Sequence, residues 1–405
     1  MRDIILIHIT GGDKPGVTAE LSQVLAEYGV DILDIGQVVI HNFLTLGILI
    51  RIPPEAEAAP IVKDILFKAH EMGVSLRLHP LEEDKYESWV QAQGKARHIV
   101  TLLGRRITAV HLQAVTSALS GNGLNIDTIH RLSGRVPVTG ELPRQACVEF
   151  TVRGTPDDNE ALRQSFLDIS ARLGVDIAYQ EDNVFRRNRR LVAFDMDSTL
   201  IQAEVIDELA DRAGVGEQVA AITEAAMRGE LDFQQSLRKR LALLKGLDAS
   251  VLEDVAAKLP LSEGAERLIS NLRRVGYKIA ILSGGFTFFG ERLAERLGID
   301  YVHANELEIV DGKLTGNVVG EIVDGARKAE LLRTIATKEG ISLQQVIAVG
   351  DGANDLPMLG LAGLGVAFHA KPKVKKGAGH AISTMGLDSI LYLIGVRDRE
   401  ALPGD

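Results

Sequence analysis

The sequence has little cysteine, no long apolar run and no excess of basic residues, and each absence narrows its class. Cys147 is its one cysteine, so the chain cannot form an internal disulfide, which fits a reducing cytoplasm. The opening MRDIILIHIT turns polar too early for a secretory signal, and no apolar run approaches the length of a membrane span. The net charge of −10 disfavours nucleic-acid or anionic-membrane surfaces. We therefore expect a cytoplasmic protein that binds neither nucleic acid nor membrane.

The first part of the chain repeats one pattern of elements. A chain of 405 residues exceeds what one core usually supports, so we expect more than one domain. Apolar periodicity predicts the order βαββαβ over residues 1–82 and again over 95–181. GVDILDI, from Gly29, matches GLNIDTI, from Gly123, which favours a duplicated module. The order predicts two α+β, ferredoxin-like units, each with an antiparallel sheet.

The segment GGDKPGVTAEL, from Gly11, resembles the ACT domain, a small module that binds amino acids and regulates enzymes of amino-acid metabolism. In serine-binding ACT domains the ligand lies at a dimer interface, between the loop before the first helix and the start of the second strand. The positions that match here are Asp13, Lys14, Pro15, Gly16 and Asp31. A helix N-terminus can hold a carboxylate and an aspartate can hold an ammonium, so the resemblance implies serine as an effector. A plain helix-starting turn is the alternative.

The second copy departs from this pattern, and a basic segment follows it. Ile107, Thr108 and Ala109 replace Asp13, Lys14 and Pro15, so we expect a dimerisation or spacer module there. Because ACT modules usually pair, the resemblance implies a homodimer through the ACT-like domains. We interpret QEDNVFRRNRR, from Gln180, as a solvated linker and not as an anion site.

From Arg190 onward, short apolar runs alternate with helical periods, a pattern typical of a parallel α/β sheet. The expected strands are Leu191–Phe194, Lys278–Leu282, Tyr301–Ala304, Val346–Val349 and Gly365–Phe368. Asp311-Gly312 indicates a hairpin turn. Asp195 and Asp197 follow the first strand, and alternation along an extended DMD would place Met196 on the opposite side.

Two further strands also end in polar motifs. SGG, from Ser283, follows the second strand, and GDGAND, which contains Asp351, follows the fourth. Open parallel sheets bind ligands at the carboxyl ends of their strands. Each motif alone is a weak signal, but three of them at one sheet edge predict a functional site.

DMDST, ILSGG, Lys328 and GDGAND together resemble the four motifs of the haloacid dehalogenase superfamily of phosphohydrolases. AEVIDELA, from Ala203, and LDFQQSLRKRLALLKGL, from Leu231, resemble segments that mark its phosphoserine phosphatases. With two ACT-like units in front, the chain resembles the actinobacterial type of that family. The resemblance implies a Rossmann-like core over 190–405 with a helical cap at about 202–262.

The resemblance also implies a reaction: Mg²⁺-dependent hydrolysis of O-phospho-L-serine, the last step of serine synthesis, through an aspartyl-phosphate. Asp195 would be nucleophile and metal ligand. Asp197 would be general acid and base, with its main-chain carbonyl on the metal, and Asp351 would complete the ligands. These oxygen donors suit hard Mg²⁺. Asp355 would support the ligands from behind. Lys328 would offset negative charge, with a surface helix lysine as its alternative.

Substrate recognition would fall to a further set of residues. Glu204 and Arg240 would bind the ammonium and carboxylate of the substrate. The residues expected around the phosphate are Ser283, Gly284 and Asn354. Met227 and Phe233 match apolar lid residues, although core packing could also explain them. The alternative substrates are phosphothreonine, phosphoproteins or another small phosphate monoester. A cap pocket small enough for one amino acid would disfavour phosphoproteins. An amino-acid sensor that acts through a partner is the alternative from another class.

Overall fold

The computed structural model describes residues 4–137, 139 and 145–402, so the outermost positions of the expected first and last domains lie outside it. The chain divides into two compact units, one that reaches to Lys95 and one that begins at Ala96. No described helix combines the length and the apolar character that crossing a membrane requires. The expected fold class, an α/β phosphatase core behind two ferredoxin-like units, is confirmed.

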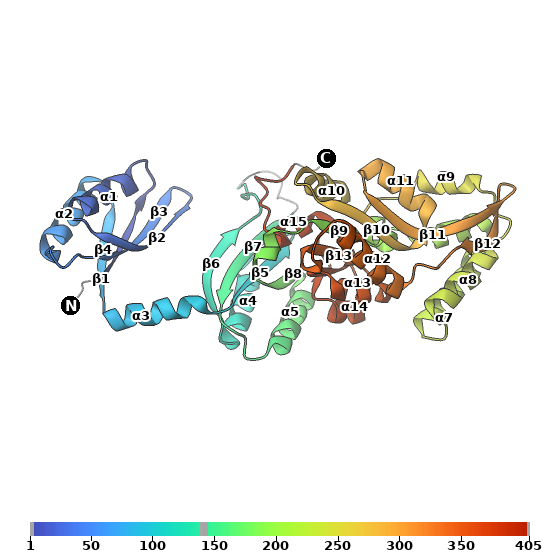
Figure 1. Ribbon diagram of the computed structural model, residues 1–405, viewed down its shortest axis with the longest axis horizontal. Coiled ribbons are helices and arrows are strands. Elements are labelled where there is room, and N and C mark those ends of the chain that lie inside the picture. The colour runs from blue at the N-terminus through green and yellow to red at the C-terminus, as the bar shows by residue number, and fades with distance from the viewer. Residues whose placement is uncertain (1–3, 138, 140–144, 403–405) are drawn as a thin grey trace. The chain divides into compact units, whose positions relative to one another are not determined.

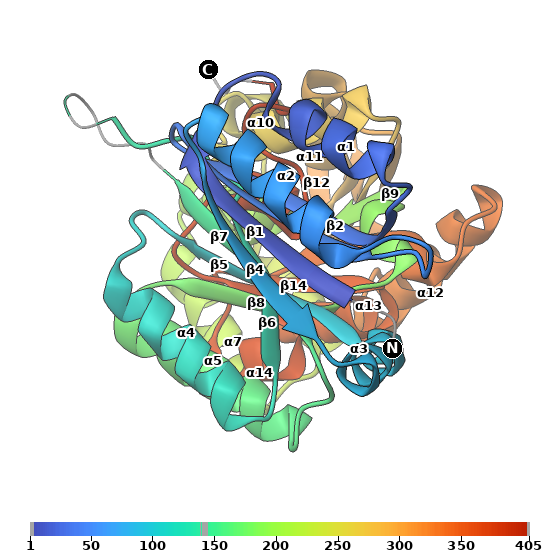
Figure 2. The same cartoon turned by 90° about the vertical axis from the view of Figure 1, so that its left-hand side faces the viewer.

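The first unit is a four-stranded antiparallel sheet covered on one face by two helices. Its elements are β1 (Ile4–Gly12), α1 (Val17–Glu27), β2 (Asp31–Ile40), β3 (Phe43–Arg51), α2 (Ala58–Glu71) and β4 (Ser75–Leu81). The strand order is β2-β3-β1-β4, and α1 and α2 lie side by side on the sheet (Figure 2). Residues of one parity on β1, such as Ile7 and Ile9, are buried against the helices. A helix α3 (Glu83–Gln91) and a short turn η1 (Ala92–Gly94) follow.

The second unit opens with the same fold. Its elements are β5 (Arg97–Gly104), α4 (Ala109–Gly121), β6 (Asn125–Arg131), β7 (Ala146–Arg153), α5 (Asn159–Leu173) and β8 (Asp176–Glu181). The order β6-β7-β5-β8 repeats that of the first unit, and α4 and α5 lie side by side on one face (Figure 2). Its opposite face packs on the phosphatase core, because Leu103, Cys147 and Ala178 belong to the core cluster of that domain. The expected spacer is therefore part of the same compact unit as the core.

The phosphatase core is a seven-stranded sheet with helices on both faces. Its strands are β9 (Leu191–Phe194), β10 (Lys278–Phe286), β11 (Tyr301–Val310), β12 (Lys313–Val319), β13 (Val346–Gly350), β14 (Leu364–Phe368) and β15 (His380–Ile382). The order is β12-β11-β10-β9-β13-β14-β15, with β12 antiparallel across the expected Asp311-Gly312 turn and the others parallel.

Alternate strand residues enter two separate cores, as expected for a sheet buried on both faces. Val192 and Phe194 of β9 belong to the larger core, and Leu191 and Ala193 to the smaller one. The helices of this domain outside the cap are α10 (Ala265–Arg274), α11 (Thr287–Leu297), α12 (Gly325–Lys338), α13 (Leu356–Leu361), α14 (Pro372–Gly377) and α15 (Ile390–Leu393). Figure 1 labels these helices. Short turns η4 (Leu343–Gln345), η5 (Ala353–Asp355) and η6 (Leu387–Ser389) connect some of them.

Four helices form the cap between β9 and β10. They are α6 (Val205–Ala213), α7 (Gly216–Met227), α8 (Phe233–Leu243) and α9 (Ser250–Ala256). The two chain segments that lead into and out of the cap pair with each other, since Ile201 and Leu261 form an antiparallel bridge. The cap also rests on the β11–β12 hairpin, where Asp248 forms a bridge with Lys313.

The arginine-rich segment between the second ACT-like domain and the core is not the solvated linker that its charge suggests. Within the turn η2 (Val184–Arg187), Arg186 is 1% exposed and forms a buried ion pair with Glu149 of β7. Arg189 is buried as well and donates a hydrogen bond of 2.7 Å to the carbonyl oxygen of Gln344. The expectation of a solvated linker is wrong because both cations have partners on elements distant in sequence.

Candidate active site

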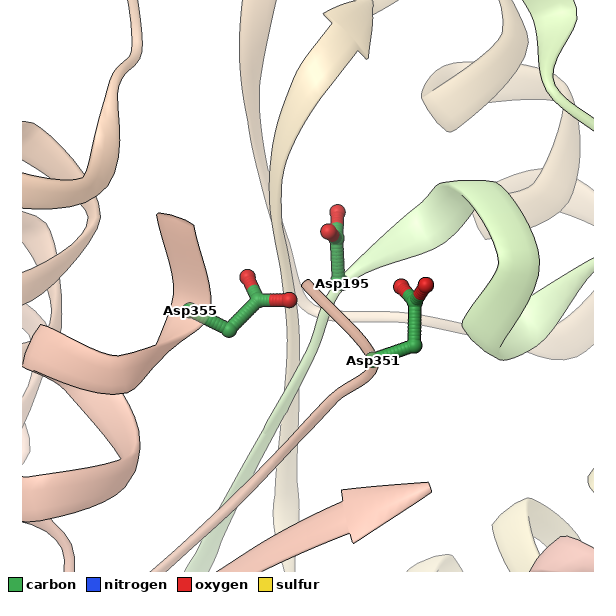
Figure 3. Close-up of side chains that lie close together, drawn as sticks. All are labelled: Asp195, Asp351 and Asp355. Carbon is green, nitrogen blue, oxygen red and sulfur yellow. The ribbon is translucent and has the colours of Figure 1, made fainter. Parts of the chain in front are cut away.

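Three parallel strands bring polar side chains to one edge of the phosphatase sheet. In the middle strand Phe194 pairs with Ile281 of β10 and Val349 of β13, so the residues that follow these three positions reach the same edge of the sheet. Asp195 follows β9 directly and Asp351 follows β13. Their carboxyl groups stand next to each other, and that of Asp355 points toward them from the following turn (Figure 3). The edge therefore concentrates three carboxylates.

These three carboxyl groups form a site that suits a hard cation. Asp195, Asp351 and Asp355 each offer an oxygen atom, and the three atoms lie within 4.8 Å of one another. An all-oxygen donor set fits Mg²⁺. Both oxygens of Asp355 are engaged, because Oδ1 accepts from Lys328 Nζ at 2.7 Å and Oδ2 accepts from the Gly352 N–H at 2.9 Å. Asp195 and Asp351 line the cavity of this site whereas Asp355 is fully buried behind it, so the first two are better placed to coordinate a metal.

Crowding and burial change how these acids titrate. Burial and the charge of Asp195 raise the pKa of both Asp351 and Asp355 to about 7. The pKa of Asp197 lies well above its usual range, first because of burial and then because Glu204 and Asp195 are close. A bound cation would remove this repulsion and favour the ionised forms.

Lys328 lies behind the acids and is fully buried at the first turns of α12. Its Nζ lies 2.8 Å from Asp195 Oδ2 and 2.7 Å from Asp355 Oδ1. Burial alone would lower the pKa of Lys328, but these two carboxylates outweigh that effect and raise it. The ammonium therefore stays charged, and the alternative of a surface lysine is wrong.

The chain turns sharply after Asp195, in the segment η3 (Met196–Leu200). Asp195 Oδ1 accepts the N–H of Met196 at 2.7 Å, and Ser198 has a left-handed backbone with φ 54°. Met196 is buried in the core, whereas Asp195 and Asp197 line the same cavity. Met196 does not line the cavity that the two carboxylates share, and this follows from the turn and not from the alternation of an extended strand. The Ser198 hydroxyl donates to Glu204 at 2.7 Å, which ties the turn to the start of the cap.

The cap and the sheet edge enclose a cavity of about 1640 Å³. The expected residues that line it are Asp195, Asp197, Glu204, Met227, Phe233, Arg240, Ser283, Gly284, Asp351 and Asn354. Lys328 and Asp355 lie behind its wall. The cavity is partly open to solvent, so its volume does not by itself select a substrate, and a pocket sized for one amino acid stays a prediction. Charged groups on its wall are available for discrimination.

The aromatic ring of Phe233 reaches the glycines after β10. A Cβ atom on Gly284 would lie 2.6 Å from Phe233 Cζ, a distance that real side chains do not tolerate. A glycine at this position therefore lets the first residue of α8 reach the sheet edge. A second contact holds the same helix, since Gln234 Nε2 donates to Asp324 Oδ2 at 2.8 Å.

Arg240 and Met227 reach the cavity from the cap. Arg240 Nε is buried and, among the residues that the structure describes, has no hydrogen-bond partner; burial lowers the pKa of the guanidinium. A buried donor of this kind is satisfied by an anionic ligand or by water. Met227 is 66% exposed at the end of α7, so core packing does not explain it. Its sulfur lies 3.2 Å from Lys371 Nζ.

Several lining residues were not predicted from the sequence. They are Ser198, Gln202, Glu263, His369, Lys371 and Lys373. Ser198 belongs to DMDST, so the motif already contained it. His369, Lys371 and Lys373 follow β14, and the same argument about strand ends applied to a further strand would have found them.

The residues expected to hold an effector do not meet within one chain. Asp13 and Gly16 follow the Gly12 end of β1, whereas Asp31 pairs across the sheet with Arg51, which lies opposite Ile4. The length of a nine-residue strand, roughly 30 Å, separates them. Asp31 also forms an ion pair of 2.5 Å with Arg51. A ligand that touches both groups would need a second chain.

Comparison with known proteins places the chain in a family. Residues 192–360 match the model for haloacid dehalogenase-like hydrolases, and residues 3–79 and 96–180 match two models for ACT domains. A phosphoserine phosphatase of Streptomyces coelicolor is 46% identical over 404 residues, which cover 99% of this chain and 94% of that protein. The chain belongs to the phosphoserine phosphatase family. Within the family, SerB2 of Mycobacterium tuberculosis is 44% identical over 402 residues, 99% of this chain and 95% of that protein.

Solved structures agree with this membership of the phosphoserine phosphatase family. A haloacid dehalogenase family hydrolase from Salmonella enterica superimposes with a TM-score of 0.64 at 32% identity, covering 74% of this chain and 99% of that one. A probable phosphoserine phosphatase from Vibrio cholerae, in an unliganded form, gives a TM-score of 0.59 at 38% identity, covering 74% and 86%. The chain is accordingly an enzyme of the hydrolase class with two ACT domains.

Proposed function

We propose that the chain hydrolyses O-phospho-L-serine to L-serine and phosphate through an aspartyl-phosphate on Asp195, in the last step of serine synthesis. The observation that carries the proposal is the cavity in which Asp195 and Asp197 face Glu204 and Arg240. Two carboxylates for phosphoryl chemistry thus share one space with a carboxylate and a guanidinium suited to an amino acid. The names of the relatives support the same substrate.

Asp195 attacks the phosphorus, and its own surroundings prepare it to do so. Lys328 Nζ at 2.8 Å from Oδ2 and the Met196 N–H at 2.7 Å from Oδ1 contact both oxygens of the carboxylate and fix its orientation. Asp197 protonates the serine oxygen as it leaves, and burial, which raises its pKa, favours the protonated form that this step needs. It then takes a proton from the water that hydrolyses the aspartyl-phosphate, which restores both acids.

The residues that would hold Mg²⁺ are Asp195 and Asp351 through their carboxylates and Asp197 through its main-chain carbonyl. Asp355 supports them from behind through its contacts with Lys328 and Gly352. When bound, the ion would neutralise phosphate charge and orient the phosphoryl group for attack. Ser283, the Gly284 N–H and Asn354 would donate to the phosphate oxygens from the same cavity.

Phosphate release from phosphoserine with Mg²⁺, and with a chelator in its place, tests the proposal directly. We expect turnover that requires Mg²⁺ and that Asp195→Asn abolishes while the fold, measured by circular dichroism, is retained. Comparison of kcat/KM for phosphoserine, phosphothreonine and a phosphoserine peptide defines the substrate. If kcat/KM for the peptide equals that for phosphoserine, the proposal of a small-molecule substrate is wrong. Substantial turnover by Asp195→Asn would show that Asp195 is not the nucleophile.

We also propose that the first ACT domain binds serine as an effector at the interface of a homodimer. Asp13 and Gly16 lie at the opposite end of the sheet from Asp31, so a two-fold pair of domains could supply both halves of a site. Strand β2 is an edge strand with exposed Ile32, Ile35 and Val38, an arrangement that favours pairing with another chain.

Sedimentation equilibrium and serine titration test this second proposal separately from catalysis. We expect a dimer, and we expect free serine to change the rate of phosphoserine hydrolysis in the wild type but not in Asp13→Ala. The assay substrate itself yields serine, so initial rates are needed. A monomer at assay concentration, or an Asp13→Ala variant with the wild-type serine response, would contradict it.

A further inference from the structure

The second ACT domain buries polar side chains on the sheet face that meets the phosphatase core. Thr101 and Glu149 lie on that face and are both buried. In the first ACT domain, Thr45 of β3 lies on the face turned away from the helices and is exposed. Glu149 has a buried partner there in Arg186, and the phosphatase core covers the face that the first domain leaves exposed at Thr45, so the second domain is adapted to a fixed neighbour. We call the interface between this sheet face and the phosphatase core the seam, and the hydrogen bonds across it show which parts of the core the second ACT domain contacts.

Asp176, the first residue of β8, accepts three hydrogen bonds from the phosphatase domain across this interface. It is 1% exposed, and its Oδ1 accepts the N–H of Ser383 at 2.8 Å. Its Oδ2 accepts the N–H of Thr384 at 2.9 Å and the hydroxyl of Thr384 at 2.8 Å. One buried carboxylate thus fixes two consecutive backbone amides of the phosphatase domain, and bonds from N–H groups to an ionised carboxylate are the stronger kind.

The segment that Asp176 holds is bonded in turn to the wall of the catalytic cavity. His369 lines the cavity and has a left-handed backbone with φ 46°. Its N–H donates to the Ile382 carbonyl at 2.7 Å, and its ring Nε2–H donates to the Met385 carbonyl at 2.9 Å. The two carbonyl groups belong to residues on either side of Ser383 and Thr384, whose N–H groups donate to Asp176. Two residues later, Lys371 contacts Met227 of the cap at 3.2 Å.

A second contact ties the same domain to another part of the cavity wall. Arg105, in the loop after β5, donates to both oxygens of Glu263 at 2.7 and 2.6 Å. Glu263 lines the cavity, and its carbonyl accepts the N–H of Leu387 at 2.8 Å. Both contacts therefore converge on residues 383–387, between the second ACT domain and the active site.

We propose that Asp176 is a positioning residue for the phosphatase reaction: through Ser383 and Thr384 it holds His369, and with it the loop that meets the cap. The second ACT domain is then a structural part of the catalytic unit, distinct in role from the first. Without the carboxylate, the loop samples more conformations, and the fraction of molecules ready to bind substrate falls. KM rises by the inverse of that fraction, while the chemistry at Asp195 is unchanged once substrate is bound.

The inference rests on the proposed phosphoserine phosphatase activity, and steady-state kinetics of the full chain with Mg²⁺ tests it. We expect Asp176→Ala to raise KM for phosphoserine roughly 5- to 20-fold and to change kcat less than about threefold. Thr384→Val removes only the hydrogen bond from the Thr384 hydroxyl to Asp176. This variant should fold even if Asp176→Ala fails to fold, and it should raise KM by a smaller factor. Hydrogen exchange should speed up in peptides that contain residues 369–371 and 383–387.

A matched control separates positioning from a general loss of stability. Val115→Ala removes apolar volume between the sheet and helices of the same domain, away from the seam. We expect it to lower thermal stability without raising KM or altering exchange at 369–371. If both seam variants keep the wild-type KM, or if Val115→Ala raises it equally, the positioning role is wrong. A wild type without phosphoserine turnover would instead overturn the proposed function.

Discussion

Lys328 Nζ lies 2.8 Å from Asp195 Oδ2, and both side chains are buried at the edge of the sheet. The lysine is the cation that compensates the acids around it before any metal binds. We predict that Lys328→Met lowers kcat for phosphoserine at least about 100-fold, because Asp195 would then face Asp355 without compensation. Lys338→Met, an exposed lysine of the same helix, is the control and should keep wild-type kinetics. Comparable activity in the two variants would contradict this role.

Metal binding should be coupled to proton release. The pKa of both Asp351 and Asp355 is raised to about 7, so each keeps its proton in the folded chain at a pH where the unfolded chain has lost it. The metal-free protein should therefore lose stability as pH rises from about 4 to about 7. Mg²⁺ requires ionised ligands, so its affinity should increase over the same range.

Calorimetry in two buffers with different protonation enthalpies measures this coupling. At about pH 6 we expect Mg²⁺ binding to release protons, and at about pH 8.5 the release should nearly vanish. Asp351→Asn removes one titrating group and should reduce the protons released along with the affinity. Equal heats in the two buffers at about pH 6 would show that the carboxyl groups are already ionised and would refute the prediction.

Glu204 and Arg240 should determine which phosphate ester is accepted. They face the same cavity as Asp195 and would bind the ammonium and carboxylate of phosphoserine. We predict that Arg240→Lys and Glu204→Gln each lower kcat/KM for phosphoserine roughly 10- to 100-fold. A simple aryl phosphate has neither group, so its kcat/KM should change little. If kcat/KM falls equally for phosphoserine and for the aryl phosphate, these residues contribute to the chemical step and not to substrate selection.

The buried pair of Arg186 and Glu149 should be important for stability. Loss of the arginine leaves a carboxylate buried without compensation, so Arg186→Met should reduce the free energy of unfolding by about 3–5 kcal/mol. Replacing both residues, with Glu149→Met added, should restore much of that loss. Urea denaturation of the wild type, Arg186→Met and the double variant measures these free energies of unfolding. A double variant no more stable than Arg186→Met would show that the pair does not account for the effect.

That pair also shows where sequence reasoning fails. The strands and the polar residues at their ends could be predicted, since periodicity and motif position are local properties, and Asp195 and Asp351 did come together. Arg186 was misread because its partner lies on another domain, and a buried and a solvated arginine look alike in sequence. Helix α3 lies between the two expected ferredoxin-like units and has no buried residue, so packing against a core does not account for it. The size of the cavity depends on the placement of the cap, which no motif specifies.

The close approach of Phe233 to Gly284 predicts that a side chain at position 284 lowers activity and that a smaller side chain at position 233 restores part of it. A Cβ on Gly284 would lie 2.6 Å from the ring, so Gly284→Ala should push α8 away from the sheet edge. We expect kcat/KM for phosphoserine to fall roughly 10- to 100-fold, with thermal stability lowered only slightly. Adding Phe233→Leu makes room for the methyl group and should recover part of the activity. Gly360→Ala, where a Cβ meets nothing within 4 Å, is the control. If Phe233→Leu does not improve the Gly284→Ala enzyme, steric conflict with the cap is not the cause.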